Sequence, residues 1–191
     1  MPTLVVIRGN SGSGKTTIAR EVRRRYGRGC ALLEQDHLRR IVLREHDSDN
    51  VDPVAPAFIV TTARAALDLG YHVVLEGILH TARYGHALRR LIDEHPGTSH
   101  VYYLDVPFAE TVRRHRGRAD QVTFTPENMR AWYAAHDVLG LAGEHVIAET
   151  ATVEDTVTTI LHTSGLAHTA ALTPCPVHCP RCATAAGTAD R

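Results

Sequence analysis

The sequence of 191 residues predicts an α/β fold in which helices cover both faces of a five-stranded parallel sheet. Short apolar runs recur along the chain, and the segments between them have the spacing of amphipathic helices. A glycine-rich loop of the phosphate-binding type directly follows the first run. Because strands that alternate with helices are joined by right-handed crossovers, this order indicates parallel strands between helical layers. One domain is expected at this length.

The apolar runs are the expected strands, at residues 4–7, 30–33, 72–75, 100–104 and 145–148. A helix is expected over residues 17–26, another from Asp36, and a long one over residues 56–69 that ends at Gly70. Residues 47–53 form a turn-rich break before the long helix, and Pro107 marks a turn and a further helix start. Thr152, with Asp155 three residues later, predicts a capped last helix. Apolar periodicity is lost beyond Gly165, which predicts a domain over residues 1–165 and a flexible tail over residues 166–191.

The overall charge of the chain is balanced, with 21 Lys and Arg against 21 Asp and Glu. A balanced chain has no net positive field, which disfavours nucleic acid and anionic membranes as partners. The first apolar run follows Met1, Pro2 and Thr3 without a basic region, and nothing later approaches membrane-spanning length. We therefore expect a cytoplasmic protein that does not associate with a membrane.

The loop at residues 9–16 reads G-N-S-G-S-G-K-T, a complete G-x-x-x-x-G-K-[ST] pattern between a strand and a helix. Its glycines let successive backbone N–H groups point inward, and the helix that follows adds its positive dipole end. Lys15 would reach the β- and γ-phosphates of ATP, and the Thr16 hydroxyl would ligate Mg²⁺. The predicted nucleotide-binding residues are Gly9, Asn10, Ser11, Gly12, Ser13, Gly14, Lys15, Thr16 and Thr17.

Carboxylates follow three of the expected strands, at the edge where parallel sheets bind ligands. Asp36 follows the second strand and is the predicted general base for an acceptor hydroxyl, with a helix cap as the alternative role. Glu34 is an alternative base or a surface carboxylate. Glu76 follows the third strand and is the predicted Mg²⁺ residue, acting through the water molecules around the ion, with an exposed turn as the alternative. Asp105 is interpreted as structural, because it precedes a helix start.

Arginines are concentrated after the fourth strand, at positions 113, 114, 116 and 118. Arg114 and Arg118 would share a helix face and are the predicted pair that closes over the γ-phosphate. A solvated basic helix is the alternative. Arg83, which follows Glu76 and Gly77, is a weaker candidate for contacting the acceptor or a phosphate.

Taken together, these segments resemble small P-loop kinases of the nucleoside-monophosphate-kinase-like group, AAA-type ATP-binding kinases that include the zeta-toxin and chloramphenicol-phosphotransferase families. The resemblance runs through residues 9–16, the D-x-x-R segment from Asp36 to Arg39, Glu76 with Gly77, and the R-x-x-x-R segment from Arg114 to Arg118. It implies a three-layer P-loop NTPase fold with strand order 2-3-1-4-5. It also implies that Asp36 is the base and that Arg114 and Arg118 belong to a lid.

The tail contains Cys175, His178, Cys179 and Cys182, which are residue types that zinc prefers. Their C-x₃-C-x₂-C spacing does not match the usual paired arrangement, and His168 is an equally plausible fourth ligand. We expect a flexible tail with incidental cysteines rather than a zinc site.

The sequence therefore favours an ATP-dependent and Mg²⁺-dependent kinase that phosphorylates a hydroxyl group of a small molecule. ATP is preferred over GTP because the chain has no N-K-x-D segment. A polynucleotide or RNA-end kinase is an alternative, suggested by the arginines near Arg23 and Arg114. A regulatory ATPase switch is another alternative. The acceptor and the oligomeric state are not encoded in any motif of this sequence.

Overall fold

The computed structural model describes residues 1–45, 54–117 and 124–171. Its centre is a five-stranded parallel sheet with the order β2-β3-β1-β4-β5, which confirms the expected topology. The strands are β1 (Thr3–Gly9), β2 (Cys30–Glu34), β3 (His72–Gly77), β4 (Thr98–Asp105) and β5 (His145–Ala148).

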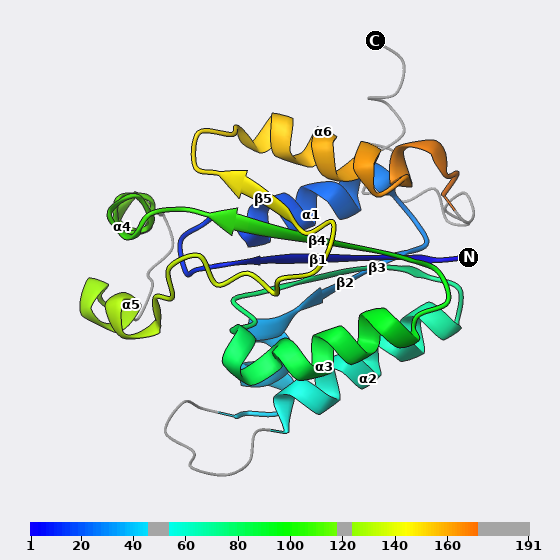
Figure 1. Ribbon diagram of the computed structural model, residues 1–191, viewed down its shortest axis with the longest axis horizontal. Helices are drawn as coiled ribbons and strands as arrows, with labels where there is room; N and C mark the ends of the chain where they lie inside the picture. The colour runs from blue at the N-terminus through cyan, green and yellow to red at the C-terminus, as the bar shows by residue number, and fades with distance from the viewer. Residues whose placement is uncertain (46–53, 118–123, 172–191) are drawn as a thin grey trace.

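Helices cover both faces of the sheet, so that the sheet and its two helical layers make the three-layer arrangement expected from the sequence (Figure 1). One face carries α1 (Lys15–Tyr26) and α6 (Val153–Thr163), and the other carries α2 (Ala55–Asp68) and α3 (Thr81–Glu94). Beyond the carboxyl ends of the strands lie α4 (Phe108–Arg116) and α5 (Pro126–Trp132). A π-helix, η1 (His37–Val42), follows β2, and a short 3₁₀-helix, η2 (Leu166–His168), follows α6. Within the described residues, none of the helices combines the length and apolar character needed to span a membrane.

The central strand β1 is buried along its whole length. Its side chains alternate between the two faces of the sheet, as the period of a strand requires. Leu4 and Val6 belong to the core under α2 and α3, whereas Val5 and Ile7 belong to the core under α1 and α6. A strand buried on both faces reads as a continuous apolar run, which is why the first strand was clear in the sequence.

Local signals set several helix ends. The Thr152 hydroxyl accepts a hydrogen bond from the backbone N–H of Asp155 at 3.1 Å, as the capping pattern predicted. By contrast, the segment after Asp36 is a π-helix rather than an α-helix, and α5 was not expected from the sequence. The turn-rich break at residues 47–53 lies outside the described residues.

Packing continues past the domain boundary expected at residue 165. Leu166 is 2 % exposed and belongs to the core under α1 and α6. The Tyr26 hydroxyl donates a hydrogen bond to the carbonyl of Ala170 at 3.0 Å. The described chain therefore packs on the domain through residue 170. Cys175, His178, Cys179 and Cys182 lie outside the described residues, so the interpretation of the tail remains a prediction.

A fully buried arginine, Arg8, lies near the carboxyl end of β1. Its guanidinium donates to the Asp137 carboxylate at 3.0 Å, to the Thr81 hydroxyl at 2.8 Å and to the Leu79 carbonyl at 2.8 Å. It also donates to the Asp137 carbonyl at 2.8 Å. Burial lowers the pKa of Arg8, and the Asp137 and Glu144 carboxylates oppose this shift. A buried charge is tolerated when it is paired and hydrogen-bonded in this way.

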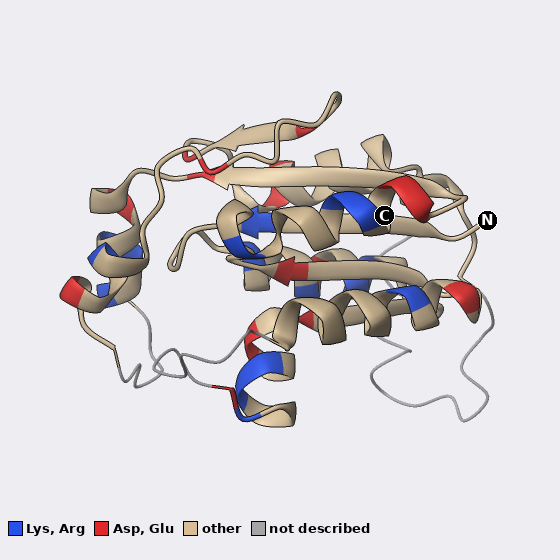
Figure 2. Ribbon diagram, turned by 60° about the horizontal axis from the view of Figure 1, so that its bottom comes forward, with Lys and Arg blue, Asp and Glu red and all other residues tan. Residues whose placement is uncertain are grey.

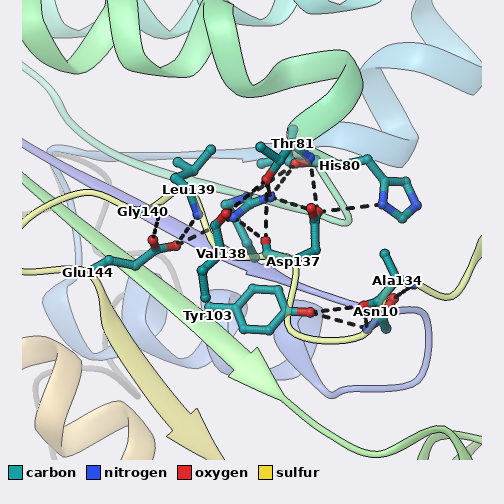
Figure 3. A network of polar contacts seen from close by, with 12 residues as sticks. Asn10, His80, Thr81, Tyr103, Ala134, Asp137, Val138, Leu139, Gly140 and Glu144 are labelled. Atoms are coloured by element: carbon teal, nitrogen blue, oxygen red, sulfur yellow. Dashed lines mark hydrogen bonds and ion pairs between the residues drawn. The ribbon is translucent and has the colours of Figure 1, made fainter.

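The residues between α5 and β5 contact Arg8 through Asp137 and Glu144, and we call residues 134–144 the 134–144 segment. Figure 3 shows this segment beside Asn10, Thr81 and Tyr103. The Glu144 carboxylate accepts hydrogen bonds from the backbone N–H groups of Leu139 at 3.0 Å and Gly140 at 2.9 Å. Glu144 also lies 3.5 Å from Arg8. Asp137 accepts the N–H of Thr81 at 2.9 Å, which ties the segment to the first turn of α3. The segment therefore joins β1 to the start of α3.

We predict that Arg8→Met lowers the free energy of unfolding by about 3 to 5 kcal/mol, because it leaves the Asp137 and Glu144 carboxylates without their buried partner. Urea denaturation of the purified variant measures this loss. Arg24→Met is the matched control, because it breaks an exposed ion pair with Glu21 and should change stability little. Equal losses in the two variants would contradict a special role for the buried pair.

Candidate active site

The phosphate loop, residues 9–16, leaves β1 at Gly9 and enters α1 at Lys15. Gly12 has a φ of 83°, in the left-handed region that favours glycine. A Cβ atom on Gly12 would lie 2.6 Å from the Thr111 carbonyl oxygen of α4. The loop therefore packs closely against α4, and its shape depends on a glycine at this position.

Lys15 begins α1 and is largely buried, at 9 % exposure. Its ammonium group donates to the Asn10 carbonyl at 3.4 Å, so the side chain lies across the loop. The N-terminus of α1 adds backbone N–H groups and the positive end of the helix dipole at the same place. This arrangement is an anion site with the donors that a polyphosphate requires.

Glu76 ends up beside the phosphate loop, as the sequence predicted. Register places Glu76 of β3 opposite Ile7 of β1, and the Thr16 hydroxyl donates to Glu76 Oε1 at 3.1 Å. Glu76 is 3 % exposed, which excludes the alternative of an exposed turn. Burial raises the pKa of Glu76, while the charge of Lys15 and the hydrogen bond from Thr16 oppose the shift.

The second carboxylate oxygen of Glu76, Oε2, is buried and has no hydrogen-bond partner among the described residues. An orphaned carboxylate oxygen beside a threonine hydroxyl fits Mg²⁺, which binds one or two carboxylates and completes its shell with phosphate oxygens and water. Within the described ranges, no group of three or more His, Cys, Asp or Glu residues is arranged for a metal ion. Thr16 and Glu76 are thus the residues that would hold Mg²⁺.

Glu34 and Asp36 lie at the end of β2, in different surroundings. The Arg20 guanidinium binds the Glu34 carboxylate through two hydrogen bonds, at 2.6 and 2.9 Å, and lowers its pKa. A lowered pKa makes Glu34 a weaker proton acceptor. The Asp36 side chain is 68 % exposed and lies 3.8 Å from Arg40. Asp36 precedes η1 without making a capping hydrogen bond, so the described structure gives no support to the helix-cap alternative.

Arg114 bridges the phosphate loop and the segment after β5. Its guanidinium donates to the carbonyls of Ser13 and Glu149, at 3.0 Å each, and to the Glu110 carboxylate at 2.7 Å. The alternative of a solvated basic helix therefore does not describe Arg114. It describes Arg113 better, because that side chain is 75 % exposed. Arg118 lies outside the described residues, so the paired lid remains a prediction.

Arg83 comes together with the arginine of the D-x-x-R segment. Both Arg83 and Arg39 contact the same oxygen of Glu45, at 3.0 and 3.2 Å. The other oxygen of Glu45 accepts the backbone N–H of Val54, beside the start of α2. Sequence patterns did not single out Glu45, because its role arises from residues on three different elements.

Two further features of this edge were missed from the sequence. Gln35 accepts the backbone N–H of Leu79 at 3.0 Å, and Gly77 packs so closely on Gln35 that a Cβ atom would lie 2.3 Å from its oxygen. Asp105, interpreted as structural, accepts a hydrogen bond from His136 at 2.8 Å if the histidine Nδ1 carries the proton. The sequence gives no local signal for this pair, because His136 lies 31 residues after Asp105.

A groove of about 620 Å³ runs beside the phosphate loop. It is bounded by α1 and the start of α6, and its lining residues are Thr16, Thr17, Arg20, Glu21, Arg24, Arg25, Val153 and Glu154. A volume of this size is in the range of small-molecule sites. Thr17, predicted as a nucleotide residue, thus faces an open groove next to the loop.

Comparisons with known proteins agree with this geometry. A family model described as "AAA domain" matches residues 4–139. Among curated proteins, no sequence matches the chain.

Solved structures with the same fold include three kinases. A sugar kinase from Janibacter sp. HTCC2649 is 20 % identical, with a TM-score of 0.64 over 87 % of this chain and 96 % of that one. A gluconokinase from Sinorhizobium meliloti 1021 is 17 % identical, with a TM-score of 0.63 over 87 % and 93 %. The APS kinase of Mycobacterium tuberculosis in complex with AMPPNP and APS is 18 % identical, with a TM-score of 0.65 over 88 % and 98 %. At identities this low, the structural similarity establishes a shared fold and nothing more.

We predict opposite effects of Glu76→Gln on stability and on Mg²⁺-dependent nucleotide binding. The raised pKa means that ionised Glu76 destabilises the ligand-free fold. The cost begins as pH rises through the ordinary carboxyl value of 4.5 and is complete above the folded pKa. The variant should therefore melt above the wild type at neutral pH, by a margin that vanishes in acid, and lose about 10 to 100-fold in metal-dependent affinity.

Differential scanning fluorimetry across pH and titration with a fluorescent nucleotide in Mg²⁺ measure the two effects. Glu94→Gln, at the exposed end of α3, is the control for removing a carboxylate that forms surface ion pairs with Arg64 and Arg90. A Glu76→Gln protein that melts below the wild type and binds nucleotide normally would show that Glu76 is a structural residue.

Proposed function

The chain belongs to the AAA domain family, and from this premise we propose that it is an ATP-dependent kinase that transfers the γ-phosphoryl group to a hydroxyl of a small molecule. The observation that carries the proposal is the Thr16–Glu76 pair. It places a buried carboxylate with an orphaned oxygen against a phosphate loop whose lysine lies 3.4 Å from the Asn10 carbonyl. This combination suits a nucleoside triphosphate with Mg²⁺.

Each residue has a distinct role in the proposed reaction. The loop N–H groups and Lys15 hold the β- and γ-phosphates. Thr16 and Glu76 would hold Mg²⁺, which would neutralise charge on those phosphates. In this proposal Arg114, whose guanidinium donates to the Ser13 carbonyl of the loop, contacts the phosphates and excludes water, and Arg118 has the same role. Asp36 takes the proton of the acceptor hydroxyl as the new oxygen–phosphorus bond forms and the bond to the leaving nucleoside diphosphate breaks.

A small acceptor is favoured over a macromolecule. The kinases with this fold are named for a sugar, gluconate and APS, which are all small molecules. Charge gives a second argument. In the ribbon of Figure 2, positions of Lys and Arg are interspersed with positions of Asp and Glu along the described elements. Helix α4 carries Glu110 as well as Arg113, Arg114 and Arg116. A polynucleotide kinase would benefit from a continuous basic stripe instead. We also propose a cytoplasmic location.

A regulatory ATPase switch is the remaining alternative. ATP consumption with Mg²⁺ in the presence of pools of sugars and sugar acids, antibiotics, and RNA or DNA oligonucleotides separates the candidates. A phosphorylated small molecule supports the proposal. Phosphorylated oligonucleotides would replace it with an end-kinase function. Slow ATP consumption without a phosphorylated product, and stimulated by a protein partner, would replace it with a switch.

We predict that Lys15→Ala abolishes phosphoryl transfer while the fold is retained. The Lys15 ammonium would neutralise charge on the β- and γ-phosphates, and this is lost with the side chain. Circular dichroism checks the fold, and product formation from γ-labelled ATP checks the transfer. Near-normal turnover by the folded variant would rule out the phosphate-loop assignment.

We predict that Asp36→Asn lowers acceptor-dependent turnover by about 10² to 10⁴-fold, because the amide does not accept the proton. Nucleotide affinity should change little, since the loop, Lys15 and Thr16 bind the phosphates. The paired measurement is the nucleotide dissociation constant and the turnover of each protein. Glu34→Gln is the matched comparison on the same strand end. A loss confined to Glu34→Gln would move the base to Glu34.

A further inference from the structure

The Asn10 side chain, in the phosphate loop, is engaged by the 134–144 segment (Figure 3). The Asn10 amide nitrogen donates to the Ala134 carbonyl at 2.8 Å, and the Ala134 N–H donates to the Asn10 amide oxygen at 3.0 Å. The Asn10 side-chain amide thus bonds both the N–H and the carbonyl of Ala134, in the way that a residue of a neighbouring strand would. Asn10 is 3 % exposed and Ala134 is half-buried, so the pair is partly shielded from water.

A second anchor lies on the other side of Gly9. The Arg8 guanidinium donates to both the side-chain carboxylate and the backbone carbonyl of Asp137, which belongs to the same segment. The segment is therefore hydrogen-bonded to Arg8 and to Asn10. These residues stand immediately before and after Gly9, at which the loop leaves β1. Gly9 is itself closely packed, because a Cβ atom there would lie 2.8 Å from the Ser13 hydroxyl oxygen.

We propose that Asn10 is a positioning residue, which binds the 134–144 segment instead of the nucleotide and thereby holds the phosphate loop in its binding shape. The segment lies 124 residues away in the sequence and is in this sense a third component of the nucleotide site, beside the loop and Glu76. The inference rests on the proposed function in one respect, because it requires a nucleoside triphosphate to bind at the loop.

The physical reason is preorganisation. A loop with glycines at positions 9, 12 and 14 has many accessible backbone conformations, and ordering it at the moment of binding costs affinity. Two anchors on either side of the entry to the loop restrict those conformations before the nucleotide arrives. The Asn10 side chain also uses its donor and its acceptor on Ala134, and it donates to the Tyr103 hydroxyl at 3.3 Å.

The first test uses the intact chain with a fluorescent ATP analogue, mant-ATP, and Mg²⁺. Asn10→Ala should weaken mant-ATP binding by about tenfold or more, since the ordering cost returns. Tyr103→Phe is the matched control. It removes the Tyr103 hydroxyl, which lies 3.3 Å from both the Asn10 amide nitrogen and the Ala134 carbonyl, and leaves the amide pair in place. Its affinity should remain within about twofold of the wild type.

The second test needs no substitution and reads the bond directly. Hydrogen exchange at the Ala134 amide reports its bond to Asn10, with and without AMPPNP and Mg²⁺. A positioning role predicts slower exchange when AMPPNP is bound, because the anchored conformation is the one that binds. Faster exchange on binding would mean that Asn10 leaves Ala134 to contact the nucleotide, which overturns the inference.

The outcomes separate this inference from the proposed function. A wild-type protein that does not bind mant-ATP overturns both. A wild-type protein that binds, together with a folded Asn10→Ala variant of equal affinity, overturns the inference and leaves the kinase proposal intact. An equal loss of affinity in Tyr103→Phe and Asn10→Ala would also overturn it, because the amide pair would then not be the determinant.

Discussion

The central position of β1 is the constraint on which the rest of the structure depends. The strand is paired on both edges and buried on both faces, so the chain leaves it at a fixed point of the sheet. Parallel register then brings the ends of β3 and β4 to the same edge. Glu76 reaches Thr16 in this way, and Tyr103 reaches Asn10. A phosphate loop after any other strand would not meet these partners.

Two buried ionisable groups at this edge, Arg8 and Glu76, have opposite environments. The first is fully paired within the fold, and the second has an oxygen left for a ligand. Arg8 has acceptors on several sides, including the Asp137 and Glu144 carboxylates, and it organises the 134–144 segment. Glu76 has a hydrogen bond to one oxygen, and its other oxygen is buried without a partner among the described residues. Leaving a polar atom unsatisfied costs stability. We propose that Mg²⁺ with a nucleotide satisfies this oxygen of Glu76.

Sequence patterns predicted the parts of the molecule that follow local rules. The strand order came from a family resemblance, and the position of Glu76 at the ligand-binding edge of the sheet from its place after an apolar run. The loop at residues 9–16 was evident because its glycines, lysine and threonine each have a known role in binding phosphate or Mg²⁺. Arg8, Glu45 and Asn10 were harder, since their roles depend on partners 129, 38 and 124 residues away. Arg8 in particular lies in an apolar strand, where a sequence pattern indicates neither its partners nor its burial. The π-helix after β2 was missed because its local sequence does not distinguish it from an α-helix.

A crystal structure of the protein with Mg²⁺ and AMPPNP would show whether Thr16 and Glu76 bind the metal ion of a nucleotide. We expect the triphosphate in the loop at residues 9–16 and a metal ion bound to the Thr16 hydroxyl. We also expect Glu76 Oε2 to bond that ion directly or through one water molecule, which would satisfy an atom that has no hydrogen-bond partner among the described residues. A nucleotide bound elsewhere, or a metal ion whose shell does not involve Glu76, would show that the Thr16–Glu76 pair is not a metal site.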